Sequence, residues 1–219
     1  MKNYELYLFW EAIMKKKIAF LIVGMVLLVT AQAITSSFAE DSKPFVPHVV
    51  DASTGNIRVP EGYRLWPTLG TWAHAKKDTT LKTNGVAVHE YHVVYTQPET
   101  IAHYQKTGQF PDGAVLVKEL LHAKTMAMST GPVVGHATTT KGWFVLVRDT
   151  QGRYKDSGLW GEGWGWSFFS AEDSVHTTSK NFKAECIPCH MPAKPLAPAN
   201  SVEEDKWIYA LGYPVLQKK

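Results

Sequence analysis

The only two cysteines of the 219-residue chain lie in one pentapeptide, Cys186-Ile187-Pro188-Cys189-His190. This Cys-x-x-Cys-His spacing is the attachment signature of c-type haem. The two thiols reach the two vinyl groups on one edge of the macrocycle, and the histidine that follows directs its imidazole at the iron. The motif therefore predicts one covalently attached haem c, with Cys186 and Cys189 as its anchors and His190 as the iron ligand.

Two other interpretations of the pentapeptide compete with haem attachment. A Cys-x-x-Cys pair can be a redox dithiol, but no βαβ pattern of the thioredoxin type precedes it and no other cysteine exists for exchange. Cys186, Cys189 and His190 could also bind zinc. A structural zinc site needs a fourth ligand, however, and three ligands within five residues are unusual.

The amino-terminal segment predicts export. Three lysines at 15–17 precede an apolar run over 18–29, which is followed by small-x-small sites at 31–33 and 37–39. This order is typical of a secretory signal peptide, so residues 1–39 are assigned to one. Bacterial haem attachment takes place outside the cytoplasm, so a periplasmic location agrees with the pentapeptide.

An uncleaved membrane anchor is the alternative for this segment. The apolar run is shorter than the roughly 20 residues that span a bilayer, but apolar residues at 6–10 add length upstream. A complete signal also starts at Met14, to which the preceding residues contribute nothing. Met14 is therefore the expected true start, which amino-terminal sequencing of the precursor would test.

Composition excludes several classes of protein. The chain is 45% hydrophobic and 20% charged, which is typical of a globular domain and not of a disordered chain. Without residues 1–39, basic residues number 19 and acidic residues 18, so the mature chain is near neutral. No basic surface for nucleic acid is expected.

The rest of the chain is interpreted as a lead-in segment (40–60) and one haem domain (61–219). Alternation of apolar and polar residues and an excess of β-branched residues predict strands, and turn signals predict a late hairpin. A proline in the first turn and a glycine at the end predict a helix between the first two strands. The expected strands are 86–95, 114–121 and 143–149, the last of which forms the late hairpin with 160–169. The expected helices are 96–108 and one from about 179. The predicted class is α+β: mainly antiparallel sheet, short helices, and a C-terminal helix carrying the haem attachment.

The position of the pentapeptide indicates what kind of haem protein this is. Only 29 residues follow His190, whereas a small electron-carrying cytochrome has a helical domain there with an axial methionine. Met191 is too close to reach the opposite face of the ring, which leaves Met126 or Met128. A methionine in such a run more often fills a gap. An open iron position is expected, which favours binding of a small molecule over simple electron carriage.

Three segments of the chain resemble the cytochrome P-460 family, which includes the beta-type cytochromes c-prime. They are residues 92–120, 184–190 and 209–216. The resemblance implies a β-rich homodimer with one c-type haem per subunit and a proximal histidine. It also implies that Lys118, which matches the family's lysine, is bonded covalently to a meso carbon of the haem.

The residues around Lys118 are unusual for a lysine. On the expected strand it shares a face with Ala114, Leu116 and Leu120. Burial favours the neutral amine, which is the nucleophile that such a bond needs. The alternative is an edge lysine whose stem covers apolar surface while its ammonium reaches water.

The chain departs from the family at one position. Members that oxidise hydroxylamine carry a distal carboxylate where this chain has Phe144, whereas the beta-type cytochromes c-prime cap the distal face with phenylalanine and bind nitric oxide. Glu90 or His92, which share one face of a strand, could supply the catalytic base instead. A solvated polar strand face is the alternative for this pair.

These observations predict a periplasmic mono-haem cytochrome that acts on small nitrogen oxides, either oxidising hydroxylamine or handling nitric oxide at an open iron. A nitric oxide-binding protein without turnover and a plain electron carrier are the alternatives. The expected partners are the small nitrogen-oxide ligand, a soluble redox protein such as another cytochrome c, and a second copy of the chain.

Overall fold

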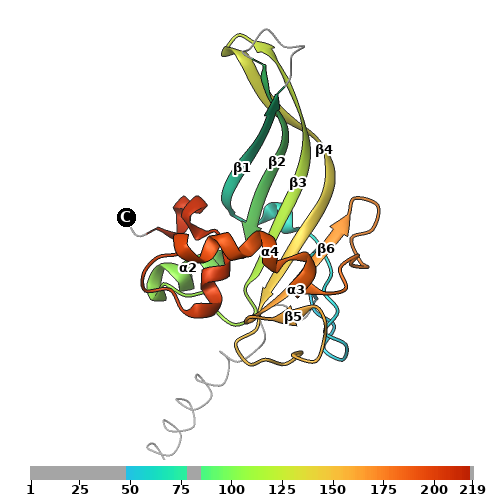
Figure 1. Cartoon of the computed structure of the whole chain (residues 1–219), viewed down its shortest axis with the longest axis vertical. Coiled ribbons are helices and arrows are strands. Elements are labelled where there is room, and N and C mark those ends of the chain that lie inside the picture. The colour runs from blue at the N-terminus through green and yellow to red at the C-terminus, as the bar shows by residue number, and fades with distance from the viewer. Residues whose placement is uncertain (1–47, 78–84, 218–219) are drawn as a thin grey trace, which may run out of the picture. The chain divides into compact units, whose positions relative to one another are not determined.

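The computed structural model describes residues 48–77 and 85–217 (Figure 1). The predicted signal peptide (1–39) and the start of the lead-in segment lie outside the described residues. Within the described ranges, no helix is long and apolar enough to cross a membrane.

Six strands form one antiparallel sheet in the order β1-β2-β3-β4-β6-β5, and the sheet curls as it crosses the molecule (Figure 1). The strands are β1 (Thr68–Lys77), β2 (Val86–Thr96), β3 (Val115–Met128), β4 (Gly131–Arg148), β5 (Trp160–Gly161) and β6 (Trp164–Ser170). The predicted α+β class with a mainly antiparallel sheet is confirmed.

The helices are short and cluster near one end of the sheet (Figure 1). They are α2 (Pro98–Thr107), α3 (Phe182–Glu185) and α4 (Ile187–His190), with 3-10 turns η2 (Tyr63–Leu65), η3 (Met191–Leu196), η4 (Glu203–Trp207), η5 (Ala210–Gly212) and η6 (Pro214–Leu216). As predicted, α2 has Pro98 in its first turn and ends at Gly108, whose φ of 77° suits glycine.

Sequence reasoning found the buried strands and missed the exposed ones. The alternation of apolar and polar residues gave no signal for β1, because Leu69 is the only buried residue of this strand. The expected strands 114–121 and 143–149 are the buried ends of a much longer β3–β4 hairpin. The outer part of this hairpin is mostly exposed, so its ladder of backbone hydrogen bonds forms without a hydrophobic pattern.

Near the helices, the sheet is buried on both faces. One core contains Leu116 and Leu146 of the central strands, packed against the C-terminal segment. The other contains Val115 and Val145, packed against residues 48–66. Of the lead-in segment, Val49, Ile57 and Val59 are buried in this second core. Burial on both faces explains why these strands carry near-continuous apolar runs.

The C-terminal segment lies very close to β1. A Cβ atom built on Gly70 would lie 2.1 Å from the carbonyl oxygen of Gly212, and one on Gly212 would lie 2.0 Å from the Trp72 ring. Real Cβ atoms do not approach other atoms so closely. The two glycines therefore permit the backbone contact that holds the last turns of the chain against the edge strand.

Candidate haem-binding site

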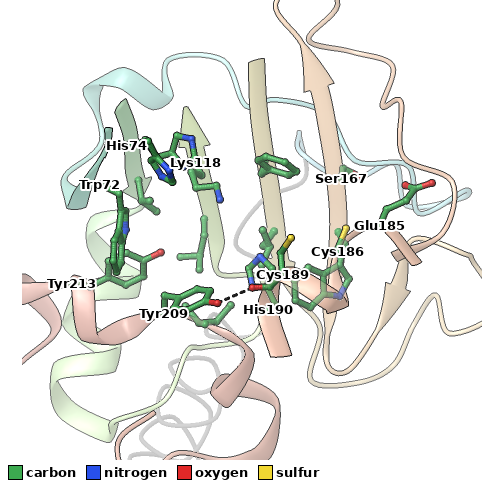
Figure 2. Close-up of a pocket in the computed structure, with 17 residues that line it drawn as sticks. Trp72, His74, Lys118, Ser167, Glu185, Cys186, Cys189, His190, Tyr209 and Tyr213 are labelled. Carbon is green, nitrogen blue, oxygen red and sulfur yellow. Dashed lines mark hydrogen bonds between the residues drawn. The ribbon is translucent and has the colours of Figure 1, made fainter. Parts of the chain in front are cut away.

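A cavity of about 430 Å³ lies between one sheet face and the C-terminal segment that carries the pentapeptide (Figure 2). Cofactor pockets span roughly 300–1,000 Å³, so this volume is in the usual range. Its walls are mostly apolar and aromatic, and include Trp72, Val94, Leu116, Leu146, Trp166 and Tyr213. Such a lining suits a flat, largely apolar macrocycle.

Two short helical turns hold the pentapeptide at the cavity wall. The side chain of Asn181 caps α3 by accepting hydrogen bonds from two backbone N–H groups of the first turn. The expected helix from about residue 179 therefore begins at Phe182. It is interrupted at Cys186, and α4 follows with Pro188 in its first turn.

This local geometry directs three functional groups into one cavity. The backbone N–H groups of Cys189 and His190 both lie 3.2 Å from the carbonyl oxygen of Cys186, which closes a helical turn. Both thiols are free, and all three side chains line the cavity. Burial raises the pKa of Cys186 to about 11, with smaller contributions from Glu185 and Cys189, so its sulfur stays a thiol near neutral pH.

His190 is oriented by a backbone carbonyl. Its Nδ1 atom lies 2.8 Å from the carbonyl oxygen of Trp207, and its ring meets that of Trp166 edge-on at 4.9 Å between centroids. A carbonyl oxygen only accepts, so Nδ1 carries the proton and Nε2 keeps its lone pair. Burial lowers the pKa of His190 to about 4, which keeps the imidazole neutral. This is the form that binds a metal.

Lys118 lies on the sheet side of the cavity, as its place on the expected strand implied. Its Nζ atom is 4.7 Å from the centre of the Phe144 ring, and it has no hydrogen-bond or ion-pair partner among residues 48–77 and 85–217. Burial lowers the pKa of this amine. In Figure 2, Lys118 points into the cavity from the sheet, and His190 lies on the opposite side.

Phe144 forms part of the same wall. It pairs directly with Lys118 across β3 and β4, and its ring lies 4.7 Å from that of Phe168. The position that resembles the family's distal carboxylate is therefore occupied here by Phe144, whose ring lines the cavity and packs against Phe168.

The structure separates the two candidates for a base. His92 lines the cavity, whereas Glu90 lies behind it, with Oε1 2.5 Å from His92 Nε2 and Oε2 2.6 Å from Lys141 Nζ. Both Glu90 and His92 are largely buried, with side chains 11% and 13% exposed. The alternative of a solvated polar strand face therefore does not describe this pair.

Sequence reasoning missed the parts of the wall that come from unpredicted elements. Trp72 and His74 line the cavity and lie on β1, a strand that the sequence did not predict. Tyr209 comes from the C-terminal turns, where its hydroxyl donates to the carbonyl oxygen of Cys189 at 2.7 Å. Of these residues, only Tyr209 had a sequence signal, since it opens the last segment of the family resemblance.

The residues present fit a haem of the c type. An apolar cavity, two free thiols on one helical turn and a neutral imidazole with an available ring nitrogen are the donor set that such a group requires. The arrangement defines the protein as a member of the cytochrome class.

Comparison with protein families gives the particular family. Residues 60–197 match the family described as Cytochrome P460, and the chain belongs to that family. Membership makes it a haem-binding cytochrome and confirms the resemblance inferred from the sequence. The last resembling segment, 209–216, lies beyond the matched range. Comparison with curated proteins finds no match.

Proposed function

We propose that the chain is an exported, periplasmic mono-haem c cytochrome that acts on small nitrogen oxides, with hydroxylamine oxidation as its reaction. Cys186 and Cys189 form the two thioethers, each thiol adding across one vinyl group, and His190 binds the iron through Nε2. The bound haem supplies a redox-active iron with one coordination position for the small molecule.

The observation that carries this proposal is the set of side chains that line the cavity wall opposite His190. The described methionines are Met126, Met128 and Met191; they are 50–56% exposed, and none of them lines the cavity. The wall instead presents the Lys118 amine and the His92 imidazole. A wall without a thioether ligand but with polar groups suits binding of a small polar molecule better than electron carriage.

Lys118 supports the family's covalent bond to the haem. Burial of an amine in a largely apolar cavity, without hydrogen-bond partners among the described residues, lowers its pKa and so favours the neutral, nucleophilic form. Joining nitrogen to a meso carbon removes one N–H and one C–H hydrogen, so the step needs a two-electron oxidant in the periplasm. The cross-linked product is therefore two hydrogen atoms lighter than its parts.

The test is mass spectrometry of the digested haem peptide, from protein made with a functioning cytochrome c maturation system. We expect the peptide with Cys186 and Cys189 to remain joined to the Lys118 peptide, at the sum of the masses less two hydrogen atoms. Lys118→Met is the matched control and should yield the Cys186–Cys189 haem peptide alone. Colourless wild-type protein would contradict the proposal.

The second half of the test is turnover of hydroxylamine with an artificial electron acceptor. We expect the wild-type protein to reduce the acceptor and the Lys118→Met variant to be much slower. Haem-loaded wild-type protein that does not turn over hydroxylamine would contradict the assigned reaction.

Phe144 favours a second candidate, a nitric oxide-binding protein without turnover. Its ring lies in the cavity wall, where a carboxylate would otherwise take protons, and packs against the ring of Phe168. This candidate predicts tight nitric oxide binding, no hydroxylamine turnover and no cross-link to Lys118. In either case the proposed partners are a soluble redox protein, such as another cytochrome c, and a second copy of the chain.

A further inference from the structure

Four side chains connect the cavity wall with the solvent. His92 of β2 lines the cavity and contacts Glu90, which contacts Lys141 of β4. His74 of the edge strand β1 packs against His92, with ring centroids 4.1 Å apart and ring planes at 37°. Lys141 is 46% exposed and His74 is also exposed, so both ends of this group reach water.

The ion pair with Lys141 determines which nitrogen of His92 is available. Burial acts to raise the pKa of Glu90, but the hydrogen bonds from Lys141 and His92 outweigh it and lower the pKa to about 2. The carboxylate is therefore ionised and only accepts. Nε2 of His92 must carry the proton that it shares with Glu90, which leaves the lone pair on Nδ1.

His92 is prepared to take a proton. Burial lowers its pKa, a shift that its hydrogen bond to Glu90 opposes, so the ring is neutral near pH 7. The carboxylate stabilises the imidazolium that forms when Nδ1 is protonated, as in other carboxylate–histidine pairs. No side chain among residues 48–77 and 85–217 hydrogen-bonds to Nδ1 of His92.

We infer that His92 accepts the protons released by the small molecule oxidised in the cavity and passes them to His74 and the solvent, with Glu90 as its positioning residue and Lys141 as the counter-ion of Glu90. This inference rests on the proposed function. An N–H or O–H bond of the bound small molecule breaks, and the proton binds Nδ1 of His92. The electron pair of that bond is among the electrons that the oxidation delivers to the redox partner. Water then carries the proton from His92 to His74.

The surrounding charges favour passage of one proton at a time. Protonation of His92 is opposed by a protonated His74, so the two histidines do not readily hold a proton at the same time. The ionisable groups around His92 are Glu90 of β2, His74 of β1, Lys118 of β3, Lys141 of β4 behind Glu90, and, across the cavity, Tyr209, Tyr213, Glu185, His190 and the two thiols.

The test measures protonation of His92 without turnover. The infrared stretching frequency of carbon monoxide bound to the reduced haem protein is recorded against pH, because this frequency responds to a charge in the cavity wall. We expect one transition in the wild-type protein. In Glu90→Gln its midpoint should fall by at least one pH unit, because the carboxylate that stabilises the imidazolium is lost.

Matched variants separate this role from a structural one. His92→Asn should abolish the transition, and Glu90→Asp should restore part of the shift. His103→Asn and Glu61→Gln change exposed residues of the same types and should leave the midpoint in place. A transition that survives His92→Asn, or a midpoint that Glu90→Gln does not move, would overturn the inference.

Turnover gives the second readout. The acid limb of the pH profile of kcat/KM should follow the same midpoint and move with it in Glu90→Gln, and His74→Asn should lower kcat with little change in KM. A low-spin six-coordinate spectrum that disappears in His92→Asn would show that His92 binds iron, which also overturns the inference. Absence of hydroxylamine turnover contradicts the proposed function alone, since the infrared titration still reports on His92.

Discussion

The Nδ1 atom of His190 lies 2.8 Å from the carbonyl oxygen of Trp207, and the bond joins α4 to η4. Trp207 is buried in the same core as Leu116 and Leu146 of the sheet. The orientation of the expected iron ligand therefore depends on how the last turns of the chain pack against the sheet. Because the acceptor is a backbone oxygen, no side-chain substitution removes it directly.

His190→Ala should keep the haem attached and lose its protein ligand. The two thioethers do not depend on the imidazole, so the purified variant should remain coloured, with an altered absorption spectrum. Added imidazole should restore the wild-type spectrum by occupying the vacated position. His103→Ala, which changes an exposed histidine of α2, is the control and should leave the spectrum unchanged. An unaltered spectrum in His190→Ala would show that another residue binds the iron.

Glu90→Gln should lower the free energy of unfolding near neutral pH, and this effect should disappear at acid pH. The pKa of Glu90 is about 2 in the folded protein, against 4.5 for the free side chain. A carboxyl group whose pKa falls on folding contributes stability above its unfolded pKa and loses this contribution as the pH falls toward its folded pKa. Because Lys141 is half-exposed, we expect a loss of roughly 2 kcal/mol at pH 7.

The measurement is urea unfolding of both proteins at several pH values between 7 and 3. The difference between wild type and Glu90→Gln should be full above about pH 5 and should shrink as the pH falls below 4.5. Glu61→Gln removes an exposed carboxylate that has no ion pair within the described residues and serves as the control. A difference that is constant across this range would contradict the assigned shift.

Asn181→Ala should weaken the turn that presents the pentapeptide. The side chain satisfies two backbone N–H groups at the start of α3, and loss of such a cap costs about 1 kcal/mol. Chemical unfolding should detect this loss, and a smaller fraction of the protein should carry haem. Asn200→Ala, at an exposed position with no described side-chain hydrogen bond, should change neither quantity. Equal haem loading in the two variants would rule out a role for the cap in attachment.

Gly212→Ala should disturb the cavity from its edge. The added Cβ would lie 2.0 Å from the ring of Trp72, which lines the cavity, so the ring or the C-terminal segment must move. Overpacking of this kind costs typically 1–3 kcal/mol. Gly131→Ala is the control, because its Cβ would meet Val134 at an ordinary 3.7 Å. Thermal unfolding should separate the two variants, and equal transition temperatures would contradict the close contact.

The sequence was sufficient for chemistry that depends on neighbours along the chain. Cys186, Cys189 and His190 lie within five residues, so a single helical turn directs them to the same side. Alternation along one strand was enough to place Lys118 among apolar side chains and His92 with Glu90 on one face, because successive strand residues point to opposite sides. The buried strands and α2 were predicted for the same reason.

Only the tertiary structure decided how groups that are distant in the sequence meet. It brought His74 of an unpredicted edge strand onto His92, paired Glu90 with Lys141, and directed the carbonyl of Trp207 at His190. Such contacts depend on sheet register and on packing between segments, which leave no pattern within a short window of residues. They also decide which ring nitrogen keeps a lone pair, so the protonation of the cavity wall is a property of the fold and not of the motif.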